Sequence, residues 1–139
     1  ISKNRQATCL MPAKVKQSIT EKYAQAYGQE NFICRLHAIG IYHCLIDHID
    51  HIPGVFICAD GHHHGKLTHH LQQLLGLKRC EKIKIVSSLR QPWGKKNKAD
   101  RLAYAVNKRG RTPTISVEEH HVDQFMKEKK KSLGRLRCI

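Results

Sequence analysis

Four carboxylates stand where an α/β domain often places its functional side chains. Asp60 directly follows the apolar run 55–59, and Asp100 opens a helical segment after a basic loop. Glu118 and Glu119 follow a third strand-like run. Carboxylate oxygens are the ligands that Mg²⁺ and Mn²⁺ prefer, and such a cation can activate water beside a phosphodiester. We therefore predict a metal site formed by Asp60, Asp100, Glu118 and Glu119, with Asp60, Asp100 and Glu118 also acting in catalysis.

Each of these carboxylates also has an ordinary structural explanation. An Asp-Gly pair after a strand, such as Asp60-Gly61, is usually a turn. An acid in the first turn of a helix usually offsets the helix dipole, which would account for Asp100, Glu118 and Glu119. The sequence alone leaves both the metal-site explanation and the structural explanation of these carboxylates open.

Histidine is unusually frequent, with eleven residues in the chain. The triplet 62–64 stands beside Asp60, and we predict that His62 acts in catalysis, by donating a proton or by contacting a phosphate. A second set falls on one helical face at positions i, i+4, i+7 and i+8: His43, Asp47, Asp50 and His51. Imidazole and carboxylate at this spacing could bind Zn²⁺ or Mn²⁺, although most such faces are solvated surface.

Positive charge is the strongest signal in the composition. Lys and Arg outnumber Asp and Glu by 25 to 11, which gives a formal net charge of +14. Such a chain attracts polyanions, because each cation that contacts a phosphate releases counterions. Trp93 could stack on a base, or it could simply cap the core. The residues predicted to bind nucleic acid lie around the Asp100 segment: Arg90, Trp93, Lys95, Lys96, Lys98, Arg101, Lys108, Arg109 and Arg111.

Hydrophobic periodicity indicates the elements that must position these residues. Helices are expected at 14–27, 31–50, 66–76, 98–109 and 118–132, and strands at 6–11, 55–59, 82–87, 112–117 and 136–139. Strands and helices alternate from residue 55 onward, which predicts an α/β fold: a mainly parallel sheet with helices on both faces. In such folds, sites lie at the carboxyl ends of the strands.

Length and cysteine use limit the remaining choices. The 139 residues suit a single domain, with a mainly helical part at 1–53 and a β-α-β-α-β-α core at 54–139. The apolar runs are too short to span a bilayer, and no signal peptide is visible in residues 1–20. The six cysteines are dispersed and contain no C-x-x-C pair. We expect a reduced, intracellular protein, in the cytoplasm, nucleoid or nucleus, with no membrane partner.

The segment Asn97–Ala103 resembles the closing part of RNase H-type domains, in which an Asn precedes an Ala-Asp-x-Leu-Ala helix start. The resemblance implies that Asp100 is a metal ligand and that Asp60 ends the preceding strand as a second one. Those enzymes also carry an Asp on a first strand and a Glu in the helix before the ligand strand. Near that Glu position this chain has Arg35 or His37.

Residues 55–139 are similar to PIN-like nucleases, particularly those of the NYN type. That family has an acid after a strand, an acid in a later helix and an acid after a further strand, which Asp60, Asp100 and Glu118 or Glu119 match in order. Where the family has an Asn shortly after its first Asp, this chain has histidines at 62–64. More weakly, residues 60–65 (Asp-Gly-His-His-His-Gly) resemble the Asp-x-Asp-x-x-Gly strand end of Toprim domains.

Together these patterns predict a nucleic-acid-processing domain, namely a metal-dependent nuclease that hydrolyses phosphodiester bonds, with RNA slightly favoured over DNA. Its cofactor would be Mg²⁺ or Mn²⁺, with Zn²⁺ held by histidines as another possibility. The alternative is a non-catalytic nucleic-acid-binding domain on a degenerate nuclease-like or Toprim-like fold. A third reading is an interaction domain whose basic surface meets an acidic protein.

Overall fold

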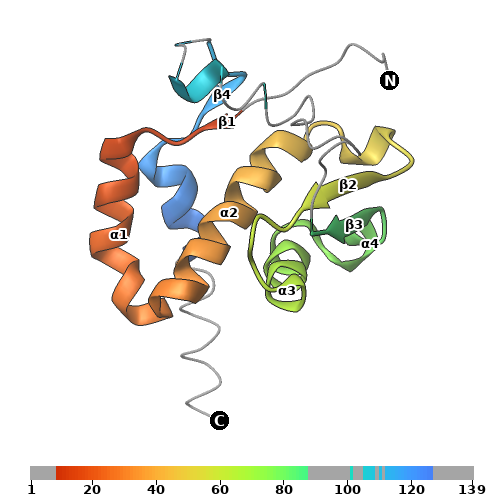
Figure 1. The fold of residues 1–139 in the computed structure, drawn as a ribbon, viewed down its shortest axis with the longest axis horizontal. Coiled ribbons are helices and arrows are strands. Elements are labelled where there is room, and N and C mark those ends of the chain that lie inside the picture. Colours follow the sequence, from red (N-terminus) through yellow and green to blue (C-terminus); the bar gives the residue numbers. More distant parts are fainter. Residues whose placement is uncertain (1–8, 88–100, 102–104, 109, 111, 127–139) are drawn as a thin grey trace.

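Two pairs of parallel strands lie among the helices of this chain (Figure 1). The computed structural model describes residues 9–87, 101, 105–108, 110 and 112–126. β1 (Cys9–Leu10) pairs with β4 (Ile115–Ser116), and β2 (Val55–Cys58) pairs with β3 (Ile83–Val86). The mixture of helices and parallel strands that the sequence predicts is therefore confirmed.

The arrangement of these strands differs from the sheet that the sequence predicts. Within the described ranges, β1–β4 and β2–β3 are two separate two-stranded sheets. Asp60 and Glu118 consequently follow strands of different sheets, and the expectation that these carboxylates meet at one sheet edge is wrong for this pair. The two strand pairs are separated because the helix α2 (Gln29–Leu45) packs between them (Figure 1).

The helices agree closely with hydrophobic periodicity. They are α1 (Ala13–Tyr27), α2 (Gln29–Leu45), the 3₁₀ turn η1 (Ile49–His51), α3 (His64–Leu75) and α4 (Leu77–Cys80), and residues 105–108 and 119–126 are also helical. Gly28 separates α1 from α2 with a φ of 81°, and Gly76 ends α3 with a φ of 90°. These positive φ values favour glycine, so the sequence marks both helix ends. Among the described residues, no helix is long and apolar enough to cross a membrane.

One predicted helix is shorter than expected. The segment 31–50 was predicted as continuous helix, but α2 ends at Leu45 and only the short η1 follows. The spacing that placed His43, Asp47, Asp50 and His51 on one helical face therefore does not apply. The predicted strand 136–139 lies outside the described residues, as do positions 6–8, 98–100, 102–104, 109 and 127–132 of the other predicted segments.

α2 is the helix shared by two hydrophobic clusters. Phe32 and Ile39 of α2 pack in one cluster with α1 and with residues 117–126. Cys34 and Ala38 pack in the other, with β2 and α3. Because these pairs occupy two sides of one helix, α2 joins the α1 side of the molecule to the β2–α3–β3 unit (Figure 1).

A buried arginine reinforces this junction. Arg35 of α2 is 2% exposed. Its guanidinium donates to Oε1 of Gln73 over 2.8 Å and to the carbonyl of Phe125 over 3.1 Å, and it lies 3.4 Å from Nδ1 of His70. Nε2 of His70 is in turn 2.8 Å from Oδ1 of Asn31. The network ties α2, α3 and the helix at 119–126 together. Arg35 therefore helps to hold the fold together.

Candidate functional site

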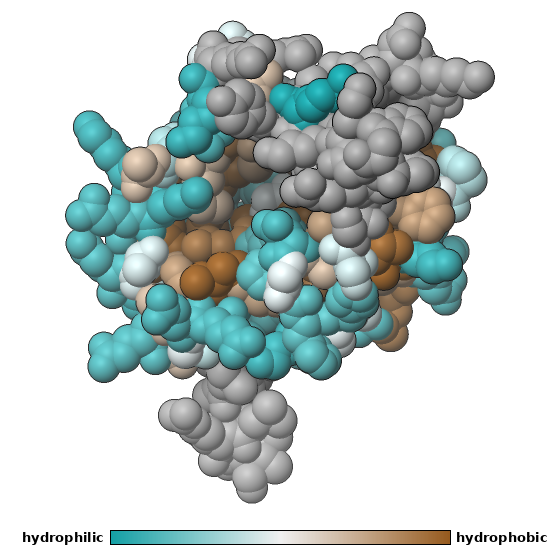
Figure 2. Space-filling model, viewed as in Figure 1, coloured by the Kyte–Doolittle hydropathy of each residue, from teal (hydrophilic) through white to brown (hydrophobic). Residues whose placement is uncertain are grey.

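An open cleft of about 1600 Å³ runs along α2 and reaches the carboxyl ends of β2 and β3. On the face seen in Figure 2, apolar side chains are enclosed by hydrophilic ones. β1, α1 and α2 contribute one side of the cleft, and Cys58, Asp60, Gly61, His62 and Ser87 contribute the strand-end side. Val106 and Asn107 also line it. This position agrees with the sequence-based expectation that a site lies beyond the ends of parallel strands.

A tight turn holds Asp60 at the edge of this cleft. The N–H of His62 donates to the carbonyl of Ala59 over 2.9 Å. Asp60 and Gly61 between them have φ values of 50° and 81°. Positive φ at both central positions is the pattern of a type I′ turn, which Asp-Gly suits because both residues tolerate left-handed backbone. The turn explains why Asp-Gly follows β2 and leaves the Asp60 carboxylate exposed to solvent.

His37 reaches the same turn from α2. Its ring centroid lies 5.0 Å from that of His62. Burial is the main cause that lowers the pKa of His37, and the neighbouring His62 lowers it further. A hydrogen bond with the Cys58 backbone and the Asp60 carboxylate act in the opposite direction. Nε2 of His37 is buried without a hydrogen-bond partner in the described structure.

His37 was not among the residues predicted for the site. Helical periodicity marks the apolar face of α2, and it does not say which polar side chain of that helix reaches the turn after β2. The available signal was its sequence position, near the point where RNase H-type domains carry a glutamate in the corresponding helix.

Glu118 lies outside the cleft. It follows β4, and neither Glu118 nor Glu119 lines the cleft. The Glu118 side chain is 67% exposed, and its Oε2 lies 3.2 Å from Nδ1 of His120. Its backbone N–H donates to Nδ1 of His121 over 3.0 Å. The structure thus places Glu118 in a local arrangement at the start of the helix at 119–126.

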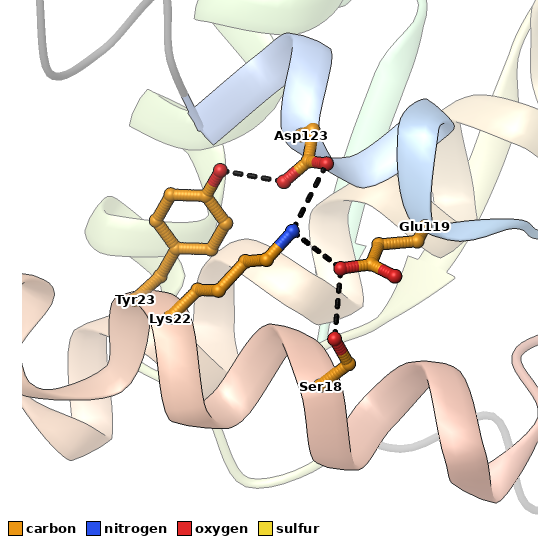
Figure 3. A network of polar contacts seen from close by, with 5 residues as sticks. All are labelled: Ser18, Lys22, Tyr23, Glu119 and Asp123. Carbon is orange, nitrogen blue, oxygen red and sulfur yellow. Dashed lines mark hydrogen bonds and ion pairs between the residues drawn. The ribbon is translucent and has the colours of Figure 1, made fainter.

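Glu119 joins a polar network between α1 and the helix at 119–126 (Figure 3). Ser18 donates to its Oε1 over 2.7 Å, and Lys22 pairs with the same oxygen. Lys22 also lies 3.4 Å from Asp123, whose other oxygen accepts a 2.5 Å hydrogen bond from Tyr23. The hydrogen bonds from Lys22 and Ser18 lower the pKa of Glu119. Burial, followed by the bond to Asp123, raises the pKa of Tyr23 to about 12.

A second group of histidines lies beside this network. The ring of His121 lies 4.1 Å from that of His120 and 5.2 Å from that of His43. Burial and the neighbouring His121 lower the pKa of His43. In the parts of the chain that the structure describes, no three His, Cys, Asp or Glu residues are grouped so that they could hold a metal ion. These residues add no support for zinc binding through histidines, which stays a prediction.

The basic residues around Asp100 are only partly described. Arg101 and Lys108 are exposed, and Lys108 directly follows the cleft residues Val106 and Asn107. The other residues predicted for metal or nucleic-acid binding in this region lie outside the described residues: Arg90, Trp93, Lys95, Lys96, Lys98, Asp100, Arg109 and Arg111. Exposed Lys16 of α1 also lines the cleft, although no pattern around it singles it out as a site residue.

Comparison with known proteins gives no relative for this chain. No model of a protein family matches it, and no curated protein and no solved structure is significantly similar to it. A functional proposal therefore rests on the cleft, its side chains and the charge of the chain.

Proposed function

We propose that this chain is a nucleic-acid-processing domain that hydrolyses phosphodiester bonds in the cleft at the ends of β2 and β3, with RNA slightly favoured. The observation that carries the proposal is the position of Asp60, an exposed carboxylate at the strand end of a large cleft. The formal charge of +14 supports a polyanionic substrate. The free cysteines of the described chain support an intracellular setting.

The proposed fold is PIN-like or RNase H-like, with the parallel sheet covered on both faces. The β2–α3–β3 unit supports it, because its two strands are parallel and neighbouring, with register Val55 to Ile83 through Cys58 to Val86. α3 and α2 pack against this pair in one cluster. A parallel pair with a helical crossover is the basic unit of such folds.

In this proposal Asp60 and Asp100 hold a divalent cation, Mg²⁺ or Mn²⁺. The oxygen donor of Asp60 suits a hard cation, and a second carboxylate is needed beside it. The bound cation would supply an activated water and neutralise charge on the phosphoryl group. Lys16, Arg101 and Lys108 would hold the phosphate backbone, and His62 would move a proton at its imidazole. Glu118 and Glu119 remain predicted ligands, although neither lines the cleft.

A second candidate is a nucleic-acid-binding domain without catalysis, on a degenerate nuclease-like or Toprim-like fold. One observation favours it: among the described residues that line the cleft, Asp60 is the only carboxylate. A lone carboxylate binds Mg²⁺ weakly, and the cleft would then retain a strand through Lys16 and neighbouring cations without cutting it.

A cleavage and binding assay separates the two candidates. Labelled single- and double-stranded RNA and DNA are incubated with Mg²⁺, Mn²⁺ or EDTA and with wild type, Asp60→Asn or Asp100→Asn. Asparagine tolerates the positive φ at residue 60, so Asp60→Asn removes the charge and keeps the turn. Glu81→Gln serves as the control, because Glu81 is an exposed acid that does not line the cleft. Glu118→Gln tests one of the two remaining predicted ligands.

The nuclease proposal expects cutting that EDTA abolishes, that Asp60→Asn loses and that Glu81→Gln retains. Tight, salt-sensitive binding without cutting in any variant would overturn catalysis and leave the binding domain. Absence of both cutting and binding near physiological salt would overturn both candidates in favour of an acidic protein partner.

A further inference from the structure

Two cysteines from distant parts of the chain meet in the cleft. Cys9 belongs to β1 and Cys44 to the last turn of α2, and both line the cleft. β1 contacts α2, and each of the two thiols acts on the pKa of the other as a side-chain hydrogen-bond partner, so the two sulfur atoms are neighbours. Both residues are half-buried, and both cysteines are free. The arrangement is a pair of adjacent thiols that solvent reaches through the cleft.

The two thiols are not equivalent. The hydrogen bond from Cys9 lowers the pKa of Cys44, since it stabilises a thiolate there. The same bond, together with burial, raises the pKa of Cys9. The thiolate is the nucleophile in thiol chemistry, so Cys44 is the attacking sulfur and Cys9 the resolving one.

The other described cysteines lie in different surroundings. Cys34 is 2% exposed. The Cys58 thiol donates to the carbonyl of Ser87 over 3.6 Å. Burial raises the pKa of Cys80.

We propose that Cys9 and Cys44 form a reactive dithiol that a small-molecule disulfide, such as oxidised glutathione, converts to an intramolecular disulfide. The Cys44 thiolate attacks one sulfur of oxidised glutathione, forms a mixed disulfide and releases one glutathione thiolate. Cys9 then gives its proton to a thiolate in solution and attacks the Cys44 sulfur, which releases the second glutathione. The protein loses two electrons, and one molecule of oxidised glutathione is reduced to two of glutathione.

The resulting bond would join β1 to α2. Cys9 pairs with Ile115 in the β1–β4 sheet, so the bond would also fix this sheet to the shared helix. Because both sulfurs line the cleft, the modification would take place on the surface where we propose that nucleic acid binds. The dithiol reaction can be tested separately from that proposed function, because mass spectrometry detects the disulfide itself.

The test is the reaction of reduced full-length chain with oxidised glutathione, followed by acid quenching, alkylation, trypsin digestion and mass spectrometry without reductant. Trypsin yields peptide 6–14 with Cys9 and peptide 36–66 with both Cys44 and Cys58. The expected product is a disulfide between these two peptides. Cys58→Ser is the matched control, because it leaves that link intact, whereas Cys44→Ser removes it.

A glutathione adduct without the link between the two peptides would overturn the proposal, as would a link that survives in Cys44→Ser. A second measurement uses the rate at which iodoacetamide labels Cys44 at neutral pH. Cys9→Ser keeps a hydrogen-bond donor and Cys9→Ala removes it, so labelling should be several-fold slower in Cys9→Ala. Equal rates in the two variants would show that Cys9 does not activate Cys44.

Discussion

Nη1 of Arg35 donates a hydrogen bond to Oε1 of Gln73 over 2.8 Å and thereby joins α2 to α3. The same guanidinium donates to the carbonyl of Phe125, which lies 90 residues further along the chain. A charged group that is 2% exposed depends on such acceptors, because it has given up most of its contact with water.

Substitution of Arg35 should therefore destabilise the fold strongly. In Arg35→Met, the acceptors on Gln73 and Phe125 lose their donor, which should lower the free energy of unfolding by about 2–5 kcal/mol. Urea denaturation followed by circular dichroism measures the change. Arg79→Met is the matched control, because Arg79 pairs with Asp50 at the surface. A midpoint as low in Arg79→Met as in Arg35→Met would contradict the structural position of Arg35.

The turn at Asp60 gives a prediction that separates stability from function. The φ of 50° is tolerated by Asp and Asn but is costly for most other residues that carry a Cβ. Asp60→Ala should lower the free energy of unfolding by about 1 kcal/mol, whereas Asp60→Asn should leave it nearly unchanged. Thermal denaturation of both variants checks this order. If Asp60→Asn were the less stable of the two, the proposed turn geometry would be wrong.

Salt should control nucleic-acid binding if the cleft holds a phosphate backbone. The logarithm of the association constant should fall linearly with the logarithm of salt concentration, with a slope of about −0.9 for each phosphate neutralised on a duplex. Lys16→Gln should reduce the magnitude of the slope by about one, because Lys16 lines the cleft. Lys78→Gln changes an exposed lysine on α4 that does not line it, and its slope should match wild type. Fluorescence anisotropy over a salt series provides the measurement.

Protonation of His43 should weaken the fold at mildly acidic pH. Its pKa is lowered in the folded state, first by burial and then by His121, so the unfolded chain binds the proton more readily. The free energy of unfolding should therefore decrease as pH falls below the ordinary histidine pKa of about 6.5, until the folded-state pKa is passed. His43→Gln should flatten this dependence between about pH 7 and pH 5. His51→Gln, at an exposed position, should keep it, and identical pH profiles for the two variants would contradict the prediction.

Oxidation of the dithiol should stabilise the protein, provided that the link between Cys9 and Cys44 forms. A cross-link between these positions closes a long loop in the unfolded chain, which is worth about 4 kcal/mol in the chain-entropy estimate. The melting temperature should rise after treatment with oxidised glutathione and fall again with dithiothreitol. In Cys9→Ala the treatment should not raise it. A wild-type melting temperature that oxidation leaves unchanged would mean that the bond strains the native fold as much as it restricts the unfolded chain.

The sequence predicts the helices of this protein well and the pairing of its strands poorly. The 3.6-residue period and Gly28 identify α1 and the start of α2, since both signals are local. β1 and β4 are two residues each, too short to show a period, and they pair across more than a hundred intervening positions. Nothing local indicates that pairing, so the sequence could not show that the described strands form two separate pairs.

Site residues were likewise predictable where local sequence sets their position, and not where the packing of distant elements sets it. Asp60 was placed correctly at a strand end, because a buried strand followed by Asp-Gly is a local pattern. Glu119 looked equivalent in sequence but pairs with Lys22 and Ser18 of α1, which only the packing of two distant helices determines. His37 was missed because its approach to His62 depends on the rotation of α2 about its axis.

The contacts of α1 have a consequence for the order of events during synthesis. Tyr23 and Asp123 are 100 residues apart in the chain, and β1 likewise waits for β4. A ribosome must therefore complete β2, α3 and β3 before β4 and Asp123, the partners of β1 and Tyr23, exist. The parallel unit at 55–86 has every strand partner within about thirty residues and can assemble early. α1 can pack on α2 at once, but the apolar surface that these two helices share stays open until residues 117–126 are made.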